Sequence, residues 1–157
     1  MLVKDAARDA AERIRAEHWN GTFPVDPVAI ARSMELDVKF TSMLPGISGA
    51  IVVRPGSAQV LIEDTDAYGR KMFTCAHEVG HFVERRAQDD RSYSFVEKRG
   101  GEYDLHEFYA DEFAGALLMP ASEFWKQERK LGSDYLLASY FGVSPTAVQK
   151  RRERLAR

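Results

Sequence analysis

The chain has 157 residues, of which 45% are hydrophobic and 29% charged, a composition typical of one globular domain with its own core. The net charge is −2, which excludes the strongly basic field that general binding to nucleic acid or anionic membranes requires. Cys75 is the one cysteine, so an intrachain disulfide is excluded and a reducing compartment is expected. No segment has the apolar length of a membrane span, and charges interrupt the N-terminal segment where a signal peptide needs an apolar run. These features predict a cytoplasmic protein without a membrane partner.

The N-terminal half predicts two helices followed by a small sheet. Apolar residues recur at helical spacing over residues 6–19, and the turn at residues 20–24 ends this helix. Asp26 and Pro27 have the pattern of an N-cap with proline at the first helical position, which opens a short helix over residues 28–34. Strand-like runs follow at residues 37–41, 49–54 and 58–63. A Pro-Gly turn joins the second run to the third, so we expect an antiparallel hairpin.

The C-terminal half predicts helices separated by one long loop. A helix is expected over residues 70–86, a polar loop over 87–103, and a second helix from about residue 102 to 118, ended by Pro120. Another helix opens near Ser122. Residues 133–156 read as two short helices, the last capped by Ser144. This order indicates an α+β fold with a small antiparallel sheet, in a single domain over residues 1–157. Residues 133–157 are expected to form a helical, helix-turn-helix-like segment of that domain.

The helix over residues 70–86 contains the pattern His-Glu-x-x-His. His77 and His81 are four residues apart, so both side chains project from one side of the helix and can bind a single metal ion. Glu78 lies about 100° further round the helix, beside the ion and within reach of a water molecule there. This arrangement predicts a zinc peptidase, with Zn²⁺ as cofactor and Glu78 as catalytic base. The competing interpretation, two surface histidines on an amphipathic helix, is disfavoured by Gly80, which leaves room for another segment to approach closely.

Catalytic zinc usually takes three protein ligands, and the helix after the loop offers the third. Glu107 and Asp111 lie four residues apart and face one way. Glu107 is expected to be the third metal ligand. Asp111 is expected to accept a hydrogen bond from the far ring nitrogen of a ligand histidine, namely His77. The alternative is a pair of solvated carboxylates on an exposed face. The competing ligands on this helix, each on a different face from Glu107, are Asp104, His106 and Glu112.

Four stretches of the sequence resemble the ImmA/IrrE family of metallopeptidases. Residues 25–31 resemble the segment that precedes the family's sheet, and residues 70–81 resemble its zinc helix. Residues 107–120, ending in Leu-Leu-Met-Pro, resemble its third-ligand helix, and residues 137–144 resemble its C-terminal helical piece. Two positions depart from the family pattern: Tyr109 stands where an acidic residue is frequent, and Asp111 where asparagine is frequent.

The resemblance implies an intracellular zinc peptidase that cleaves a helix-turn-helix repressor, in control of stress-response, mobile-element or toxin–antitoxin genes. Such a substrate would dock through the loop over residues 87–101, through the C-terminal helices, and by adding a strand to the free edge of the sheet at residues 49–63. The donors considered for stabilising the tetrahedral oxyanion are Tyr93, Tyr103, Tyr109 and His106.

Two other functions remain open at this stage. One is a catalytically silent regulator that acts by docking on a partner, although an intact Glu78 speaks against it. The other is DNA binding through the basic residues 150–157, which follow a helix-turn-helix-like segment. A solvated terminal helix, whose cations favour the C-terminal end of the helix dipole, explains the same residues, and the acidic net charge favours that explanation. Direct nucleic-acid binding is therefore not expected, and the sequence leaves the oligomeric state open.

Overall fold

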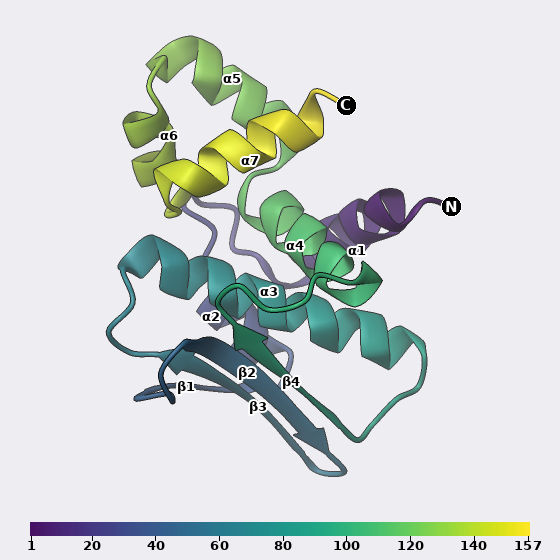
Figure 1. Cartoon of the computed structure of the whole chain (residues 1–157). Helices are drawn as coiled ribbons and strands as arrows, with labels where there is room; N and C mark the ends of the chain where they lie inside the picture. The colour runs from purple at the N-terminus through teal and green to yellow at the C-terminus, as the bar shows by residue number, and fades with distance from the viewer.

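The computed structural model describes residues 1–157 and contains seven helices and one four-stranded sheet (Figure 1). The elements in chain order are α1 Val3–His18, α2 Pro27–Ser33, β1 Asp37–Thr41, β2 Ile47–Arg54, β3 Ser57–Glu63, α3 Tyr68–Ala87, β4 Tyr93–Lys98, α4 Leu105–Leu118, α5 Ala121–Leu131, α6 Asp134–Phe141 and α7 Pro145–Leu155. The predicted α+β class is confirmed. The expected caps are also present, since Asp26 accepts hydrogen bonds from the first turn of α2 and Ser144 from the first turn of α7.

The sheet differs from the prediction in two respects. Its strand order is β1-β3-β2-β4, and β1 pairs with β3 in parallel rather than antiparallel fashion. The chain reverses once between β1 and β2 and once more in the β2–β3 hairpin, so β3 runs in the same direction as β1. The second difference is β4, which lies within the segment predicted to be a loop and pairs antiparallel with β2. As a result, both edges of the β2–β3 hairpin are occupied, and the free edges of the sheet belong to β1 and β4.

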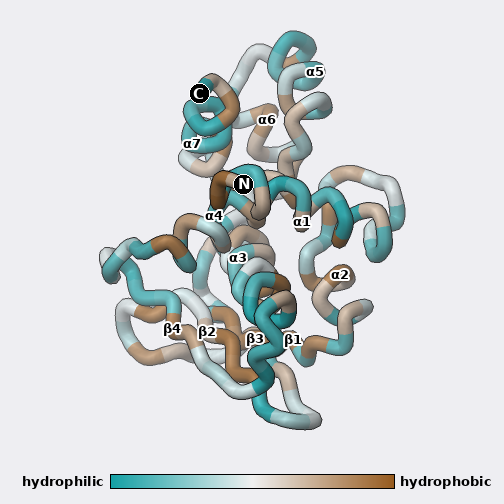
Figure 2. The backbone as a smooth tube through the Cα atoms, turned by 90° about the vertical axis from the view of Figure 1, so that its right-hand side faces the viewer, coloured by the Kyte–Doolittle hydropathy of each residue, from teal (hydrophilic) through white to brown (hydrophobic).

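Helix α3 crosses one face of the sheet, and α4 packs on α3 from the opposite side (Figure 1). Helix α1 covers α4 further out, while α5, α6 and α7 form a separate group of helices at the end of the molecule away from the sheet. In Figure 2 hydrophobic colour marks much of β2 and β3, whereas α1, α5 and α7 are mostly hydrophilic. None of the helices combines the length and hydropathy needed to cross a membrane.

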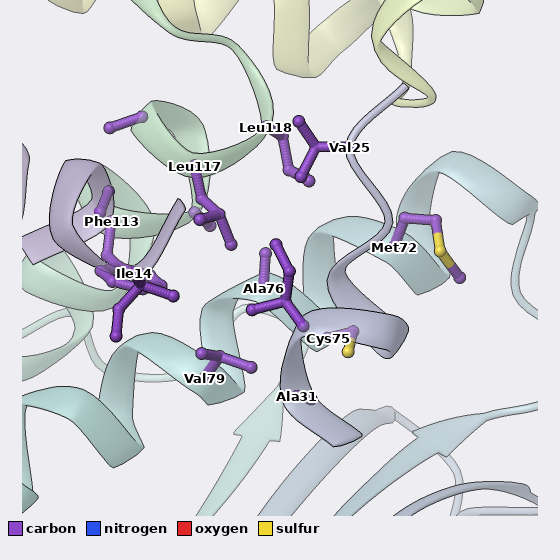
Figure 3. Packing of buried hydrophobic residues seen from close by; sticks show 14 of the residues in the cluster. Ile14, Val25, Ala31, Met72, Cys75, Ala76, Val79, Phe113, Leu117 and Leu118 are labelled. Atoms are coloured by element: carbon purple, nitrogen blue, oxygen red, sulfur yellow. The ribbon is translucent and has the colours of Figure 1, made fainter. Parts of the chain in front are cut away.

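The core is built around the apolar stripe of α3. Its predicted members Met72, Cys75, Ala76, Val79 and Val83 are all buried, and Figure 3 shows several of them facing residues of α1 and α4. On the sheet side, Gly49 allows the closest approach, because a Cβ atom built there would lie 2.5 Å from Thr74 Cγ2 and 2.9 Å from the Leu61 carbonyl oxygen. The absence of a side chain at Gly49 therefore sets how near α3 lies to β2.

A buried carboxylate connects the first, fourth and seventh helices. Glu112 is 1% exposed. Its Oε2 atom lies 3.2 Å from Arg8 Nε and 3.5 Å from Arg151 Nη1, and its Oε1 atom lies 3.5 Å from Arg154 Nη1. Arg151 also donates to the carbonyl of Met119 just beyond the end of α4, at 3.0 Å. A buried charge is tolerated only when it is paired in this way, so this cluster fixes α7 against the rest of the chain.

Candidate metal centre

The two histidines of the motif lie side by side on the middle turns of α3. Both are buried, and their ring centroids are 4.8 Å apart, with the planes at 81°. Their Nε2 atoms both lie near the side chain of Glu107 on α4. Glu107 Oε2 is 2.9 Å from His77 Nε2, and Glu107 Oε1 is 3.3 Å from His81 Nε2. The structure thus brings the three predicted ligands into contact across the α3–α4 interface.

Gly80 makes this contact between the helices possible. A Cβ atom at Gly80 would lie 3.0 Å from Ala110 Cα and 3.1 Å from Phe113 Cδ1. Real Cβ atoms rarely approach other atoms this closely, so any larger residue would push α4 outwards. The close approach expected from the sequence at Gly80 is therefore present, and the approaching segment is α4.

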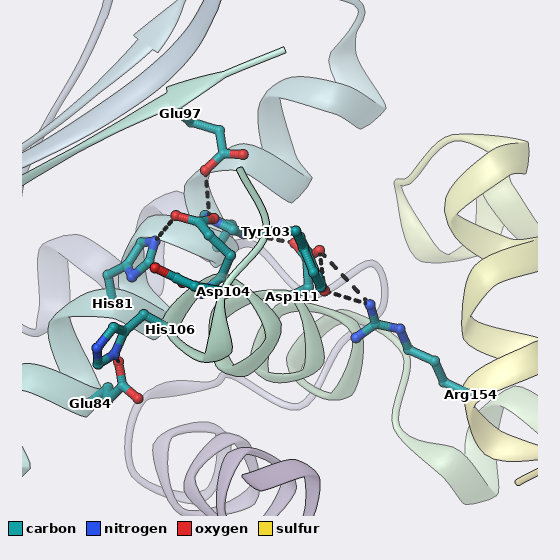
Figure 4. Close-up of polar contacts among 10 residues, drawn as sticks. His81, Glu84, Glu97, Tyr103, Asp104, His106, Asp111 and Arg154 are labelled. Carbon is teal, nitrogen blue, oxygen red and sulfur yellow. Dashed lines mark hydrogen bonds and ion pairs between the residues drawn. The ribbon is translucent and has the colours of Figure 1, made fainter. Parts of the chain in front are cut away.

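A fourth side chain, which sequence reasoning missed, reaches the centre from the sheet. Glu97 on β4 places its Oε2 atom 2.8 Å from His77 Nε2 (Figure 4). Ligand atoms of His77, Glu78, His81 and Glu97 all lie within 4.8 Å of one another. The only signal in the sequence was the alternation Tyr93, Phe95, Glu97, which points these residues to one face of a strand.

The chemistry of these atoms fits a metal cation. His77 Nε2 and both ring nitrogens of His81 are buried without a hydrogen-bond partner. Because His77 Nδ1 bonds to a carboxylate, Nε2 of the neutral ring presents a lone pair, and this lone pair faces the carboxylates of Glu97 and Glu107. Lone pairs and negative oxygens at such distances repel unless a cation lies among them. Imidazole nitrogens together with carboxylate oxygens form a donor set that zinc accepts.

Glu78 lies beside the two histidines. It is fully buried, and neither carboxylate oxygen has a hydrogen-bond partner. Burial raises its pKa to about 8, although the neighbouring His77 lowers it and Glu97 and Glu107 raise it further. A carboxyl group with a pKa this near neutrality can both accept and release a proton, which is the property required of a general acid–base residue.

A chain of hydrogen bonds links His77 to the last helix. His77 Nδ1 lies 2.8 Å from Asp111 Oδ1, so the predicted hydrogen bond is present. Tyr103 donates its hydroxyl to Asp111 Oδ2 at 3.0 Å, and Arg154 Nη2 donates to the Tyr103 hydroxyl at 2.9 Å (Figure 4). Through these contacts the loop before α4 and helix α7 both orient Asp111.

The ionisation of this cluster follows from its contacts. Without a cation at Nε2, burial alone would lower the pKa of His77, but the carboxylates of Asp111, Glu107 and Glu97 outweigh it and raise that pKa well above its usual value, so that a proton takes the place that a metal ion would hold. Burial would raise the pKa values of Asp111 and Glu107, but the contacts to His77 hold both below their ordinary range. The two carboxylates are therefore charged at neutral pH.

The remaining residues considered from the sequence lie outside the centre. Asp104 caps α4 by accepting from the Glu107 amide at 2.9 Å, and His106 Nδ1 bonds to Glu84 Oε1 at 2.8 Å. Tyr93 and Tyr109 have no hydrogen bond to any residue of the centre. The competing ligand Glu112 belongs to the buried arginine cluster described above. Cys75 packs in the core, where burial raises the pKa of its thiol far above the usual value.

Most of the chain matches a known protein family. The model of a peptidase family described as "IrrE N-terminal-like domain" matches residues 31–153. The chain belongs to this family. Membership supports a metallopeptidase-like function, and the matched region includes every residue of the metal centre. A comparison with curated proteins gave no match.

The IrrE-like fold recurs in a solved structure. A Mycobacterium tuberculosis transcriptional regulator superposes with a TM-score of 0.67 at 22% sequence identity, covering 96% of this chain and 50% of the regulator. The chain therefore spans about half the length of that protein, and at this identity the likeness concerns the fold.

A cavity of about 510 Å³ opens beside the centre of this IrrE-like domain. His77, Glu97 and Asp111 line one end, and Arg70 and Lys150 lie among the residues that line the rest. The cavity therefore extends from His77 at the metal centre to α7, and cationic side chains lie along it.

Proposed function

We propose that this protein is a cytoplasmic zinc-dependent endopeptidase whose substrate is a helix-turn-helix transcriptional repressor. In this proposal His77, His81 and Glu107 hold the zinc ion, and Glu78 is the catalytic residue. Membership of the IrrE-like peptidase family supports the reaction class. The substrate class rests on the resemblance of the sequence to peptidases that cleave repressors.

The observation that carries the proposal is Glu78. A carboxyl group buried without a hydrogen-bond partner costs several kcal/mol whether or not it is charged, and a zinc site with only a structural function has no use for it. The side chain is nevertheless placed against the two ligand histidines, with both oxygens unpartnered. This arrangement supports catalysis over the alternative of a silent docking protein.

A zinc ion held by these ligands would lower the pKa of water towards neutrality and would polarise the scissile carbonyl. Glu78 then accepts the proton of the attacking water and delivers it to the leaving amine. Asp111 keeps the proton of His77 on Nδ1, so that Nε2 remains available as a ligand. The cavity accommodates the peptide on the same side of α3 as these groups.

The terminal cations support a protein partner over nucleic acid. Arg152 pairs with Glu128 and Asp134, each at 2.6 Å, and Arg151 and Arg154 are engaged with Glu112. Arginines neutralised by internal carboxylates release few counterions on binding a phosphate backbone, and counterion release provides most of the affinity for DNA.

Incubation of the zinc-loaded protein with the helix-turn-helix repressor encoded by a neighbouring gene tests this function. We expect one cut in the repressor, located by mass spectrometry, and no cut with the Glu78→Gln variant. Casein serves as the unstructured control substrate. Rapid digestion of casein with the repressor left intact would contradict the proposed selectivity, and a zinc-loaded protein that hydrolyses neither would favour the docking function.

A further inference from the structure

The metal centre contains one carboxylate more than a catalytic zinc site needs. Catalytic sites have three protein ligands and an open position, whereas structural sites have four protein ligands and no open position. Two histidines and Glu107 already provide three ligands. Glu97 Oε2 lies as close to His77 Nε2, at 2.8 Å, as the Glu107 oxygen does, at 2.9 Å.

The backbone of the sheet aims Glu97 at the centre. Glu97 is opposite Gly49 in the pairing of β4 with β2, and the register shifts between Ile47 and Gly49. This shift leaves Ser48 as an extra residue, a β-bulge of the kind that redirects side chains near functional sites. Because Gly49 has no side chain, nothing from β2 separates Glu97 from α3.

Contacts on both sides of Glu97 hold β4 in this position. Phe95, two residues earlier on the same face, stacks on the ring of His81 with centroids 4.3 Å apart and planes at 6°. Beyond the strand, Arg99 forms an ion pair with Asp66 and donates to Ser48 Oγ at 3.2 Å. The strand that carries Glu97 is thus fixed to α3, to the segment before α3, and to the bulge.

We infer that Glu97 is a fourth protein ligand, which closes the coordination shell of the proposed zinc site and keeps the peptidase latent until a substrate displaces this carboxylate. The inference rests on the proposed function. Its location suits displacement, because β4 is the edge strand next to the cavity and Glu97 lines that cavity. A substrate backbone that adds to the free edge of β4 would lie directly beside the carboxylate.

Two binding measurements on the Glu97→Gln variant test this inference without relying on catalysis. Zinc affinity, measured by competition with a chromophoric chelator, should fall by at least about tenfold, because even mutation of residues that only hydrogen-bond to a metal ligand lowers the affinity by this much. Acetohydroxamate, measured by calorimetry on the zinc-loaded protein, should bind more tightly by a similar factor, because the fourth position is then open. Glu102→Gln is the matched control: it removes one carboxylate from an exposed position in the following loop, and it should leave both affinities unchanged.

Glu97→Asp provides a second variant that retains the charge but withdraws the oxygen by one carbon. It should also weaken zinc binding if the contact is direct. Wild-type zinc affinity in both Glu97 variants, or an equal loss in Glu102→Gln, would overturn the inference and leave the proposed function intact. A wild-type protein that takes up no zinc at all would overturn both.

Discussion

Replacing Gly80 by alanine should disturb the metal centre without touching any ligand. The new Cβ atom would lie 3.0 Å from Ala110 Cα and 3.2 Å from the Ala110 carbonyl oxygen. Both atoms belong to the backbone of α4, so the contact is relieved only if the helix moves by several tenths of an ångström. Glu107 lies one turn earlier on the same helix and must move with it. Metal sites require their ligands within about 0.5 Å of the productive geometry, so we expect zinc affinity to fall.

The cost in stability can be estimated from two opposing effects. Overpacking a close helix contact costs about 1–3 kcal/mol, whereas alanine in place of glycine within a helix contributes about 1 kcal/mol. The metal-free protein should therefore lose about 0–2 kcal/mol in its free energy of unfolding. Chelator competition measures the zinc affinity, and urea denaturation in excess chelator measures the stability.

Gly115→Ala is the control on the partner helix. Its Cβ atom would meet Arg151 Cδ at 3.4 Å, an ordinary contact with a flexible side chain. This variant gains the same helix propensity, so it should bind zinc like the wild type and be equally or more stable. If Gly80→Ala also bound zinc with wild-type affinity, the view that the α3–α4 distance sets the position of Glu107 would be refuted.

Three further predictions concern the centre itself. Glu107→Ala should weaken zinc binding more than Asp111→Ala, for which a loss of roughly 10–100-fold is expected. His106→Ala should leave the zinc affinity, measured by chelator competition, unchanged. If His106→Ala had the largest effect of the three, the predicted register of the helix would be wrong. Glu78→Gln should retain zinc but abolish peptide cleavage. In the metal-free protein the pKa of the buried Glu78 is raised to about 8, whereas in the unfolded chain it is about 4.3. Ionisation of Glu78 therefore destabilises the folded wild type increasingly as the pH rises between these two values. Compared with the wild type, Glu78→Gln should be more stable at pH 9 by about 1–3 kcal/mol and equally stable near pH 4. Denaturation at both pH values checks the sign. Finally, the wild type should bind one zinc per chain, and zinc at about 1,000 times its dissociation constant should add about 4 kcal/mol to the free energy of unfolding, measured by melting with and without chelator.

The parts of the centre that lie on helices could be predicted from the sequence. His77 and His81 share a face of α3 because of their spacing, and the apolar stripe of that helix determines which face is turned to the core. Asp111 was expected to bond to a ligand histidine because it follows Glu107 by one turn, and its oxygen lies 2.8 Å from His77 Nδ1. Local periodicity was sufficient to pair His77 with His81 and Glu107 with Asp111, because each pair spans about one turn of helix. The contact between the two pairs was inferred instead from the three protein ligands that catalytic zinc usually takes.

The contribution of the sheet could not be predicted in the same way. Strand β4 alternates Tyr93, Phe95 and Glu97 inwards with Ser94, Val96 and Lys98 outwards, so both faces mix polar and apolar residues. A strand of this composition is stabilised by its pairing with β2, at least 40 positions earlier in the chain, and such pairings leave no local periodicity. Glu97 was missed for this reason. Its contact with His77 exists only once the sheet, the bulge at Ser48 and helix α3 are assembled.

Helix α4 satisfies several unrelated requirements at once, and this has a consequence for how its sequence can vary. Nine of its 14 residues are buried: one side packs on α3, another carries Glu112 into the arginine cluster, and Glu107 and Asp111 face the metal centre. Helix α4 therefore has no face that is simply exposed to solvent. In a saturation-mutagenesis scan, tolerance to substitution in α4 should therefore lack the helical periodicity that an amphipathic surface helix shows. The helix should accept substitutions nearly as poorly as a strand covered on both faces.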